Sequence, residues 1–335
     1  MMDDDISVIE LVGSLASPSP SIDTTQRAAL THFAQAVLAG LARPPRSIPC
    51  RFFYDAKGSE LFEEITKLED YYPTRVETEL LLAHGAEIGN LVGRGRMLVE
   101  FGSGSSRKTS LLIQALGGVP AYVPIDIAGE SLAEAADWLR GQHSDLVIKP
   151  LIADFTTAVA LPSVASGGPK LGFFSGSTIG NLTHGEASAF LANAARLLGR
   201  GSFFLIGVDL KKAPAILLPA YNDAGGVTAA FNLNLLARIN RELEGDFDLS
   251  AFSHRAVWNR LEGRMEMHLE ALRTHRAHAA GRAFPFVRGE TIHTENSYKY
   301  TEEGFADLAA RAGWRVTRRW VSPEPVFAIF LLAGD

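Results

Sequence analysis

Two spacings of apolar residues follow each other along the chain, and each predicts a different kind of element. Apolar residues three or four positions apart predict helices, whereas short apolar runs predict strands. Between residues 97 and 208 the two patterns alternate regularly. Strands are predicted at 97–101, 121–125, 147–152, 170–175 and 202–208, with helices at 106–116, 130–140 and 184–198. Such repeated strand–helix units predict a parallel sheet with helices on both faces.

The pattern differs on both sides of this region. Toward the N-terminus, apolar spacing predicts helices at 25–41, from 59 onward and at 76–88. After residue 210 a helix is predicted at 227–243, and Met265, Met267 and Leu269 alternate with polar residues as on an antiparallel strand. Near the C-terminus a helix at 302–310 precedes two strands, at 314–320 and 325–332, which are expected to close the sheet as a hairpin.

These patterns predict an α/β fold with a Rossmann-like sheet and a second, smaller α+β domain formed by the N-terminal segment and an insertion. The sheet domain is expected to cover 76–210 and 299–335, and the second domain 21–75 and 211–298. Residues 1–20 end in Ser-Pro-Ser-Pro and are expected to form a flexible arm. The second domain would cover the carboxyl ends of the strands, where parallel sheets bind their ligands.

The first strand of the alternating region runs into Glu100-Phe-Gly102-Ser-Gly104, and a helix follows. Glycines let the backbone approach a ligand, and free N–H groups at a helix start favour anionic or electron-rich groups. A dinucleotide fingerprint needs a third glycine where this chain has Arg107, and the P-loop spelling is also missing. An acid followed by G-x-G resembles motif I of the class I S-adenosylmethionine (SAM) methyltransferases. A plain structural turn is the alternative interpretation.

Acids also end the next two predicted strands. Asp126 stands where an acid can accept both ribose hydroxyls of a nucleoside. Asp154 and Phe155 follow the third strand, where they can supply an acceptor for an adenine amino group and an apolar wall beside the ring. Each acid alone is also compatible with a helix N-cap. Acids at successive strand ends favour SAM.

Composition narrows the classes of ligand. The net charge is −6 and no block of Lys and Arg is present, so no nucleic-acid partner is expected. The one cysteine, Cys50, excludes an internal disulfide. The acidic N-terminus and the lack of a long apolar run predict a cytoplasmic protein without a membrane partner. His275 and His278 have ligand-like spacing but no third ligand nearby, which predicts a solvated loop and no metal.

Several longer strings resemble one enzyme family. They are Phe53-Tyr-Asp-Ala-Lys-Gly-Ser-Glu-Leu-Phe62, Ile65-Thr-Lys-Leu-Glu-Asp-Tyr-Tyr-Pro-Thr-Arg75, Gly176-Ser-Thr-Ile-Gly-Asn-Leu182, Tyr221-Asn-Asp-Ala-Gly-Gly-Val-Thr-Ala-Ala-Phe-Asn232 and Thr294-Glu-Asn-Ser-Tyr-Lys299. Together they resemble the L-histidine Nα-methyltransferase family of ergothioneine biosynthesis, from about residue 25 onward. The pattern departs from the family at Asn296 and at Glu69-Asp70.

The resemblance implies trimethylation of the α-amino group of L-histidine to hercynine, with SAM consumed and S-adenosylhomocysteine released each time. It also implies a small-molecule substrate, and we expect a monomer. The implied substrate-binding residues are Tyr71, Asn181, Tyr221, Met267, Glu295 and Ser297, of which Tyr71 and Asn181 are the implied catalytic residues. The implied SAM contacts are Tyr54, Gly102, Lys108, Asp126, Asp154 and Phe155.

The chemistry of these residue types suits that reaction. Glu295 and Ser297 are two positions apart and would share one face of a strand, while Asn296 and Tyr298 would share the other. An imidazole needs a charged acceptor and a second polar partner, whereas an indole has one N–H and would leave the carboxylate partly unpaired. The pair therefore favours histidine over tryptophan.

Three other interpretations stay open at this point. An N-methyltransferase of a tryptophan-like amino acid is the nearest alternative. An NAD-dependent oxidoreductase is opposed by the missing third glycine. A SAM-binding protein without catalytic activity is opposed by the presence of Tyr71, Asn181 and Glu295.

Overall fold

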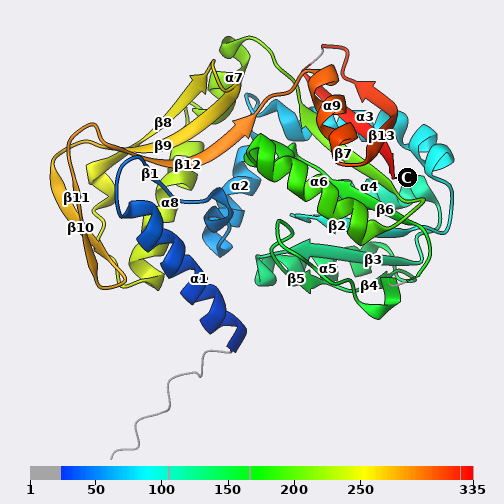
Figure 1. Ribbon diagram of the computed structural model, residues 1–335, viewed down its shortest axis with the longest axis horizontal. Helices are drawn as coiled ribbons and strands as arrows, with labels where there is room; N and C mark the ends of the chain where they lie inside the picture. Colours follow the sequence, from blue (N-terminus) through cyan, green and yellow to red (C-terminus); the bar gives the residue numbers. More distant parts are fainter. Residues whose placement is uncertain (1–23, 105, 166, 325, 335) are drawn as a thin grey trace, which may run out of the picture.

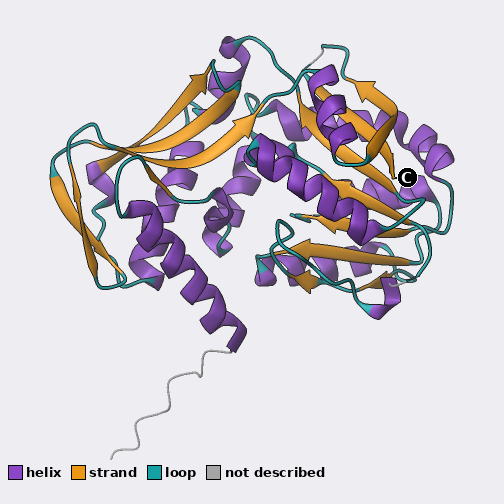
Figure 2. Ribbon diagram, in the orientation of Figure 1, coloured by secondary structure: helices purple, strands orange, loops and turns teal. Residues whose placement is uncertain are grey.

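The computed structural model describes residues 24–104, 106–165, 167–324 and 326–334. The flexible arm predicted for residues 1–20 lies outside these ranges. Figures 1 and 2 show two sheets beside each other with helices packed around them. None of the described helices is both long enough and apolar enough to cross a membrane.

The larger sheet carries the strand–helix repeats. Its strand order is β13-β14-β7-β6-β2-β3-β4, and β5 pairs with β3. The strands are β2 (Met97–Phe101), β3 (Ala121–Asp126), β4 (Val147–Ile148), β5 (Leu151–Ile152), β6 (Lys170–Phe174), β7 (Phe203–Asp209), β13 (Trp314–Val321) and β14 (Phe327–Gly334). From β2 the chain continues to β3 on one side and later returns to β6 on the other, all in parallel. The sheet therefore has a topological switch point beside β2, where ligands of such folds bind.

Every residue of β2 and β6 is buried, which shows that both faces of this sheet are covered. One face packs apolar side chains of α6 (His184–Leu198) and α9 (Glu302–Arg311). The opposite face packs α3 (Tyr72–Val92), α4 (Arg107–Leu116) and α5 (Gly129–Gln142). The hairpin of β13 and β14 pairs antiparallel with β7. The predicted α/β sheet and its closing hairpin are confirmed.

The second sheet has the order β1-β12-β9-β8. These strands are β1 (Arg46–Ser47), β12 (Thr291–Tyr298), β9 (Arg264–Ala271) and β8 (Phe252–Asn259), and a separate hairpin joins β10 (His275–Ala279) to β11 (Arg282–Phe286). Met265, Met267 and Leu269 share one core with side chains of α1 (Thr24–Leu41), α2 (Ala56–Lys67) and α8 (Val227–Glu242). The N-terminal segment and the insertion thus bury apolar surface together, while the exact domain boundaries stay a prediction.

Helix starts differ from the predictions for local reasons. Helix α2 begins at Ala56 and not at Ser59, because the Asp55 side chain accepts a hydrogen bond from the Gly58 N–H at 2.7 Å and caps the first turn. A Cβ on Gly58 would meet the Phe53 carbonyl oxygen at 1.8 Å, so only glycine fits there. Helix α3 begins at Tyr72, with Pro73 in its first turn, where a proline costs no hydrogen bond.

Three further elements differ from the sequence pattern. The predicted strand 147–152 is split into β4 and β5 around Pro150, which has no N–H to donate. Helix α7 (Pro214–Tyr221) was missed, because it is almost uniformly apolar and contains Pro219. His275 and His278 lie on β10 and not in a loop; His275 stacks on Phe286, and His278 pairs with Asp246.

Candidate functional site

The turn between β2 and α4 has the backbone that its two glycines allow. Gly102 has φ +72° and Gly104 has φ +48°, both in the left-handed region that favours glycine. The Gly102 N–H donates to the Ile125 carbonyl at 2.8 Å, which ties the turn to β3. A Cβ on Gly102 would lie 3.4 Å from the Phe155 ring. Two of the predicted cofactor residues therefore lie side by side.

Asp126 ends β3 beside the same turn. Burial raises the pKa of its carboxyl group, and the backbone amides of Ala128, Ile127 and Gly104 oppose that increase. One carboxylate oxygen accepts the Ala128 N–H at 3.0 Å. The side chain is thus an acceptor group at the carboxyl edge of the sheet, within reach of the glycine turn.

Asp154 is partly occupied by its own loop. Its Oδ1 accepts hydrogen bonds from the Thr156 N–H at 2.9 Å and the Thr156 hydroxyl at 2.5 Å. The other oxygen faces Arg51 Nε at 3.8 Å. No helix starts here, so Asp154 is not a helix N-cap. The Oδ2 atom of Asp154 is therefore the oxygen available to a ligand. Its approach to Arg51 brings the N-terminal segment to the edge of the large sheet.

Two charged groups near the turn already have protein partners. Lys108, in the first turn of α4, forms an ion pair with the buried Glu77, which also accepts the Gly176 N–H at 2.8 Å. Glu100 is buried and accepts hydrogen bonds from Thr109 and Tyr122. Burial raises the pKa of Glu100 to about 8. Glu100 therefore supports the turn from behind, and a contact of Lys108 with a cofactor stays a prediction.

An aromatic group connects the cofactor side to the substrate side. The Tyr54 ring lies 5.6 Å from that of Phe62, and Phe62 lies 6.1 Å from Tyr71. Burial raises the pKa of Tyr54, and the charges of Glu295 and Asp126 raise it further. Tyr54 therefore lies within electrostatic range of Glu295, a predicted substrate residue, and of Asp126, a predicted cofactor residue.

Tyr71 precedes α3 and faces the same group of residues. Burial raises the pKa of its hydroxyl, and Tyr221 and Glu295 add to the increase. Its hydroxyl makes no hydrogen bond to another residue in the described ranges. Tyr71 therefore lies within electrostatic range of Tyr221 and Glu295, and no described residue occupies its hydroxyl.

Glu295 is brought into this group by an irregularity of β12. The strand is in register at His293, which pairs with His268, and again at Glu295, which pairs with Met267. Burial raises the pKa of Glu295 to about 7, and the charge of Lys299 opposes the increase. No residue in the described part of the chain donates a hydrogen bond to this carboxylate. Among the described residues the carboxylate is therefore an acceptor whose hydrogen-bond partner is missing.

Ser297 and Tyr221 meet directly, although 76 positions separate them. Their hydroxyl oxygens are 2.7 Å apart, and Lys299 donates to each of them at 2.7 Å. Asn181 ends the turn Thr178–Asn181, where a Cβ on the neighbouring Gly180 would meet the Tyr298 carbonyl of β12 at 2.7 Å. The Asn181 amide has no hydrogen bond to any described residue, so none joins it to Tyr71 or Tyr221.

A buried ionic network next to these hydroxyls was not predicted. Asp209, at the end of β7, accepts from Lys299 at 2.6 Å, from Lys212 and from the Tyr72 hydroxyl at 2.8 Å. The sequence carried two signals for it. If the predicted strand 202–208 is extended by one residue, Asp209 lies at the same edge of the sheet as Asp126. Lys299 is two positions beyond Ser297, so on a continued strand the two side chains would point to the same face.

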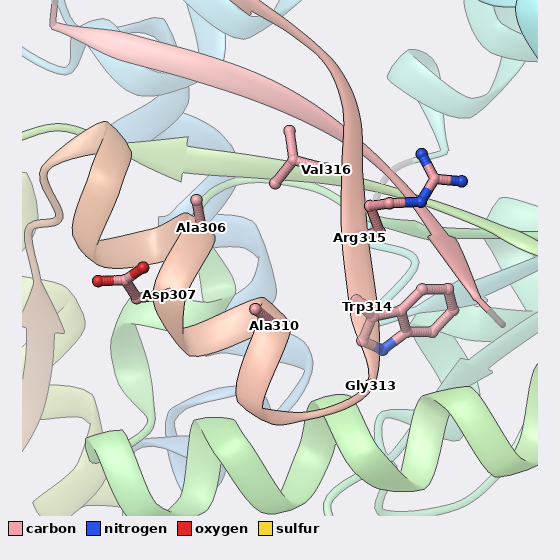
Figure 3. Close-up of a pocket in the computed structure, with 7 residues that line it drawn as sticks. All are labelled: Ala306, Asp307, Ala310, Gly313, Trp314, Arg315 and Val316. Carbon is pink, nitrogen blue, oxygen red and sulfur yellow. The ribbon is translucent and has the colours of Figure 1, made fainter.

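Two surface hollows are lined by none of the predicted site residues. One is formed by α9 and β13, as Figure 3 shows, and is lined by Ala306, Asp307, Ala310, Gly313, Trp314, Arg315 and Val316. The other lies on the second sheet and is lined by Arg255, Val257, His268 and Thr291. Neither contains a residue predicted to bind the cofactor or the substrate.

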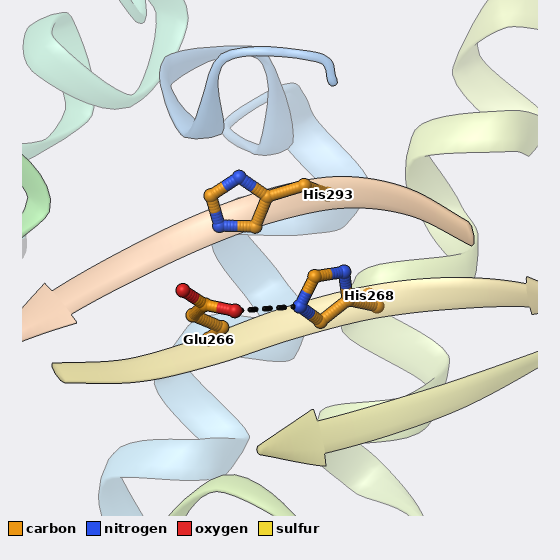
Figure 4. A group of neighbouring side chains, drawn as sticks. All are labelled: Glu266, His268 and His293. Atoms are coloured by element: carbon orange, nitrogen blue, oxygen red, sulfur yellow. Dashed lines mark hydrogen bonds and ion pairs between the residues drawn. The ribbon is translucent and has the colours of Figure 1, made fainter. Parts of the chain in front are cut away.

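One group of side chains could in principle hold a metal ion. Glu266, His268 and His293 offer ligand atoms within 4.8 Å of one another (Figure 4). Glu266 already accepts from Asn259 and Arg264, and His268 lies 3.0 Å from it. The Nε2 of His293 lies 2.9 Å from the Glu295 carbonyl oxygen. Both oxygens of Glu266 and the Nε2 atoms of both histidines are thus already hydrogen-bonded, whereas the buried Nδ1 of His268 has no partner among the described residues. We assign no metal to the group.

Comparison with known proteins adds an independent finding. A family model described as "Histidine-specific methyltransferase, SAM-dependent" matches residues 33–334. The chain is 42% identical to the histidine N-alpha-methyltransferase of Mycobacterium tuberculosis, over 89% of this chain and 93% of that protein. It is 41% identical to the protein of the same name from Mycolicibacterium smegmatis, over 88% and 92%. It is 30% identical to Ergothioneine biosynthesis protein 1 of Neurospora crassa, over 82% of this chain and 32% of that longer protein.

Proposed function

Because the chain belongs to the family of histidine-specific, SAM-dependent methyltransferases, we propose that it transfers methyl groups from SAM to the α-amino group of L-histidine. Three transfers give hercynine, a step toward ergothioneine, as the name of the Neurospora relative suggests. Family membership confirms the predicted enzyme class and cofactor. The roles of the individual residues are part of the proposal.

The choice of histidine as substrate rests on the Glu295 carboxylate, which lacks a hydrogen-bond donor among the described residues. This carboxylate is partly buried, and it lies within electrostatic range of Tyr54, Tyr71 and Tyr221. A hydrogen bond to a charged group contributes on the order of 1.5–3 kcal/mol. An imidazole N–H of the substrate supplies such a bond. Ser297, on the same face of β12, supplies the second polar partner.

The residues at the carboxyl edge of the large sheet suit SAM. The Gly102–Gly104 turn keeps side chains away from the switch point, and Asp126 offers an acceptor for ribose hydroxyls. Phe155 supplies an apolar wall beside Gly102. When bound there, SAM supplies a methyl group on a sulfonium, and its transfer leaves the C–S electron pair on sulfur as a thioether.

The residues of the chain then align and shelter the amine. The raised pKa of Tyr71 keeps its hydroxyl protonated, so it orients the neutral amine and does not remove its proton. The proton released after each of the first two transfers passes to solvent, and the third transfer releases none. The rings of Tyr54 and Tyr71 stabilise the growing ammonium by cation–π attraction, about 0.5–2 kcal/mol. Asn181 holds the substrate carboxylate with its free amide.

Product analysis tests the proposal directly. The purified protein is incubated with SAM and, separately, with histidine, tryptophan and tyrosine, and the products are identified by mass spectrometry. We expect mono-, di- and trimethylated histidine together with S-adenosylhomocysteine. Methylation of tryptophan in preference to histidine would favour the tryptophan-like alternative. SAM binding without any methylated amino acid would point to a non-catalytic protein.

A further inference from the structure

The side chain of Lys299 is buried, yet its ammonium group is fully engaged. It lies just beyond β12 and is 2% exposed. Its three partners are Asp209 Oδ2 at 2.6 Å, Tyr221 Oη at 2.7 Å and Ser297 Oγ at 2.7 Å. An ammonium group has three hydrogens to donate and no acceptor. Both hydroxyl oxygens therefore accept from Lys299, and neither can donate to it.

This arrangement restricts the hydrogens of the two hydroxyls. Tyr221 and Ser297 carry one hydrogen each, and one of the two lies in the 2.7 Å contact between their oxygens. The hydroxyl that accepts this bond also accepts from Lys299, so its own hydrogen must point elsewhere. The pair thus presents one hydrogen outward. Without Lys299, either hydroxyl could turn its hydrogen into the space that the ammonium now fills.

We propose that Lys299 is a positioning residue for the amino-acid substrate, which makes the Tyr221–Ser297 pair a hydrogen-bond donor to histidine. The outward hydrogen suits the acceptor atoms of histidine, which are its carboxylate and its unprotonated ring nitrogen. The positive charge of Lys299 also favours the ionised form of Glu295. The inference rests on the proposed function, because it assumes that histidine binds beside Tyr221 and Ser297.

The network offers a matched control within 3 Å of the same aspartate. Lys212 is also paired with Asp209, and it donates to the Tyr72 hydroxyl at 2.7 Å. It has no hydrogen bond to Tyr221 or Ser297 among the described residues. In Lys299→Met, Asp209 keeps Lys212 as a partner, and in Lys212→Met it keeps Lys299. The two variants therefore remove equivalent charges from one carboxylate, but only one of them touches the hydroxyl pair.

Calorimetric titration of histidine into the protein saturated with S-adenosylhomocysteine tests the inference without relying on turnover. We expect Lys299→Met to weaken histidine binding by roughly tenfold to a hundredfold, as for loss of a charged hydrogen-bond network. Affinity for S-adenosylhomocysteine should change by less than about twofold in both variants, and Lys212→Met should bind histidine within about threefold of the unmodified protein. Thermal denaturation establishes that each variant is folded, and Lys299→Gln replaces Lys299→Met if the latter is not.

A double-mutant cycle separates positioning from a general structural role. In a Tyr221→Phe, Ser297→Ala background, adding Lys299→Met should weaken histidine binding by less than about twofold, because the two hydroxyls that Lys299 orients are already gone and Asp209 keeps Lys212. Additive effects, or equal weakening by Lys212→Met and Lys299→Met, would overturn the inference. If the unmodified protein binds S-adenosylhomocysteine but not histidine, the proposed function fails instead.

Discussion

At the scale of single residues, the titration of Glu295 is tied to substrate binding. Burial raises its pKa from 4.5 to about 7, so the folded protein holds this proton more tightly than the unfolded chain does. Between those two pH values Glu295 therefore makes the unfolding free energy fall as the pH rises. The same rise in pH produces the carboxylate that an imidazole N–H needs. Free protein and substrate complex thus respond to pH in opposite directions.

We expect Glu295→Gln to raise the KM for histidine by roughly tenfold or more, because a charge-assisted hydrogen bond of about 1.5–3 kcal/mol is lost. The KM for SAM should stay nearly unchanged. In the unmodified protein, histidine affinity should increase as the pH rises through about 7, and the variant should lose that part of the dependence. Steady-state kinetics measures the two KM values. Calorimetric titration of histidine from pH 6 to 8, corrected for the ionisation of free histidine, measures the pH dependence of the affinity in the unmodified protein and in the variant. Equal losses for histidine and SAM would remove Glu295 from the imidazole site.

Gly102 and Gly95 form a second residue-scale test. Both have positive φ, +72° and +78°, so alanine at either costs about 1–2 kcal/mol of backbone strain. Only at Gly102 would the new Cβ face Phe155, at 3.4 Å; at Gly95 no atom lies within 4 Å. We expect both variants to lower the melting temperature, but only Gly102→Ala to weaken SAM binding, measured by calorimetry. Equal SAM affinity in the two variants would place SAM away from the turn.

At the scale of elements, the irregularity in β12 decides which side chains face inward. Met265, Met267 and Leu269 share the buried face of β9, and their partners across the ladder are Ser297, Glu295 and Ile292. Regular alternation would put Ile292 and Glu295 on opposite faces. The extra residue, Thr294, brings them to the same face, as bulges do. Its hydroxyl lies 2.8 Å from Asn232 Oδ1 and 3.0 Å from the Met267 carbonyl oxygen.

Thr294→Val keeps the shape of this residue and removes its hydroxyl. We expect a loss of about 1–3 kcal/mol of stability, because the buried Asn232 oxygen loses its donor. Histidine binding should weaken as well, since Glu295 is the next residue along the bulge. Urea denaturation and histidine titration measure the two effects. A destabilised variant with unchanged histidine affinity would show that the bulge does not position Glu295.

At the scale of the whole molecule, Asp209 connects the two sheets. It ends β7 of the large sheet, and its partners are Tyr72 at the start of α3, Lys212 after β7 and Lys299 after β12 of the second sheet. The two lysines hold the pKa of Asp209 below its ordinary value despite burial. One carboxylate thus joins segments of both sheets, and through Lys299 it is connected to Tyr221 and Ser297.

Asp209→Asn should destabilise the protein by about 3–5 kcal/mol, because it leaves two enclosed ammonium groups without their counter-charge. Asp137→Asn is the matched control: Asp137 is 74% exposed and pairs with Arg140 on the surface of α5. That change should stay within about 0.5 kcal/mol. Urea denaturation at pH 7 compares them. Similar small losses in both would show that the network contributes little to the junction.

The local features of this protein follow from its sequence. The alternating strand and helix patterns, the Gly102–Gly104 turn and the acids at strand ends depend on residues within a few positions of each other, so spacing and backbone preference reveal them. The alternation of Glu295 and Ser297 was also readable, and Ser297 and Asn296 do lie on opposite faces of β12. Family-like strings then supplied candidates such as Tyr71 and Asn181, whose roles stay predictions.

Other features were decided only by the tertiary structure. Lys299 meets Asp209 across 90 positions of sequence, Ser297 meets Tyr221 across 76, and Arg51 faces Asp154 across 103. The bulge at Thr294, and the way Thr109 and Tyr122 turn Glu100 away from the ligand edge, likewise depend on neighbours from other elements. Residue spacing carries no information about such pairs, because burial and hydrogen bonding between them arise only when separate elements pack together. The sequence by itself determined the sheet and its ligand edge, and packing decided which charged groups are free there.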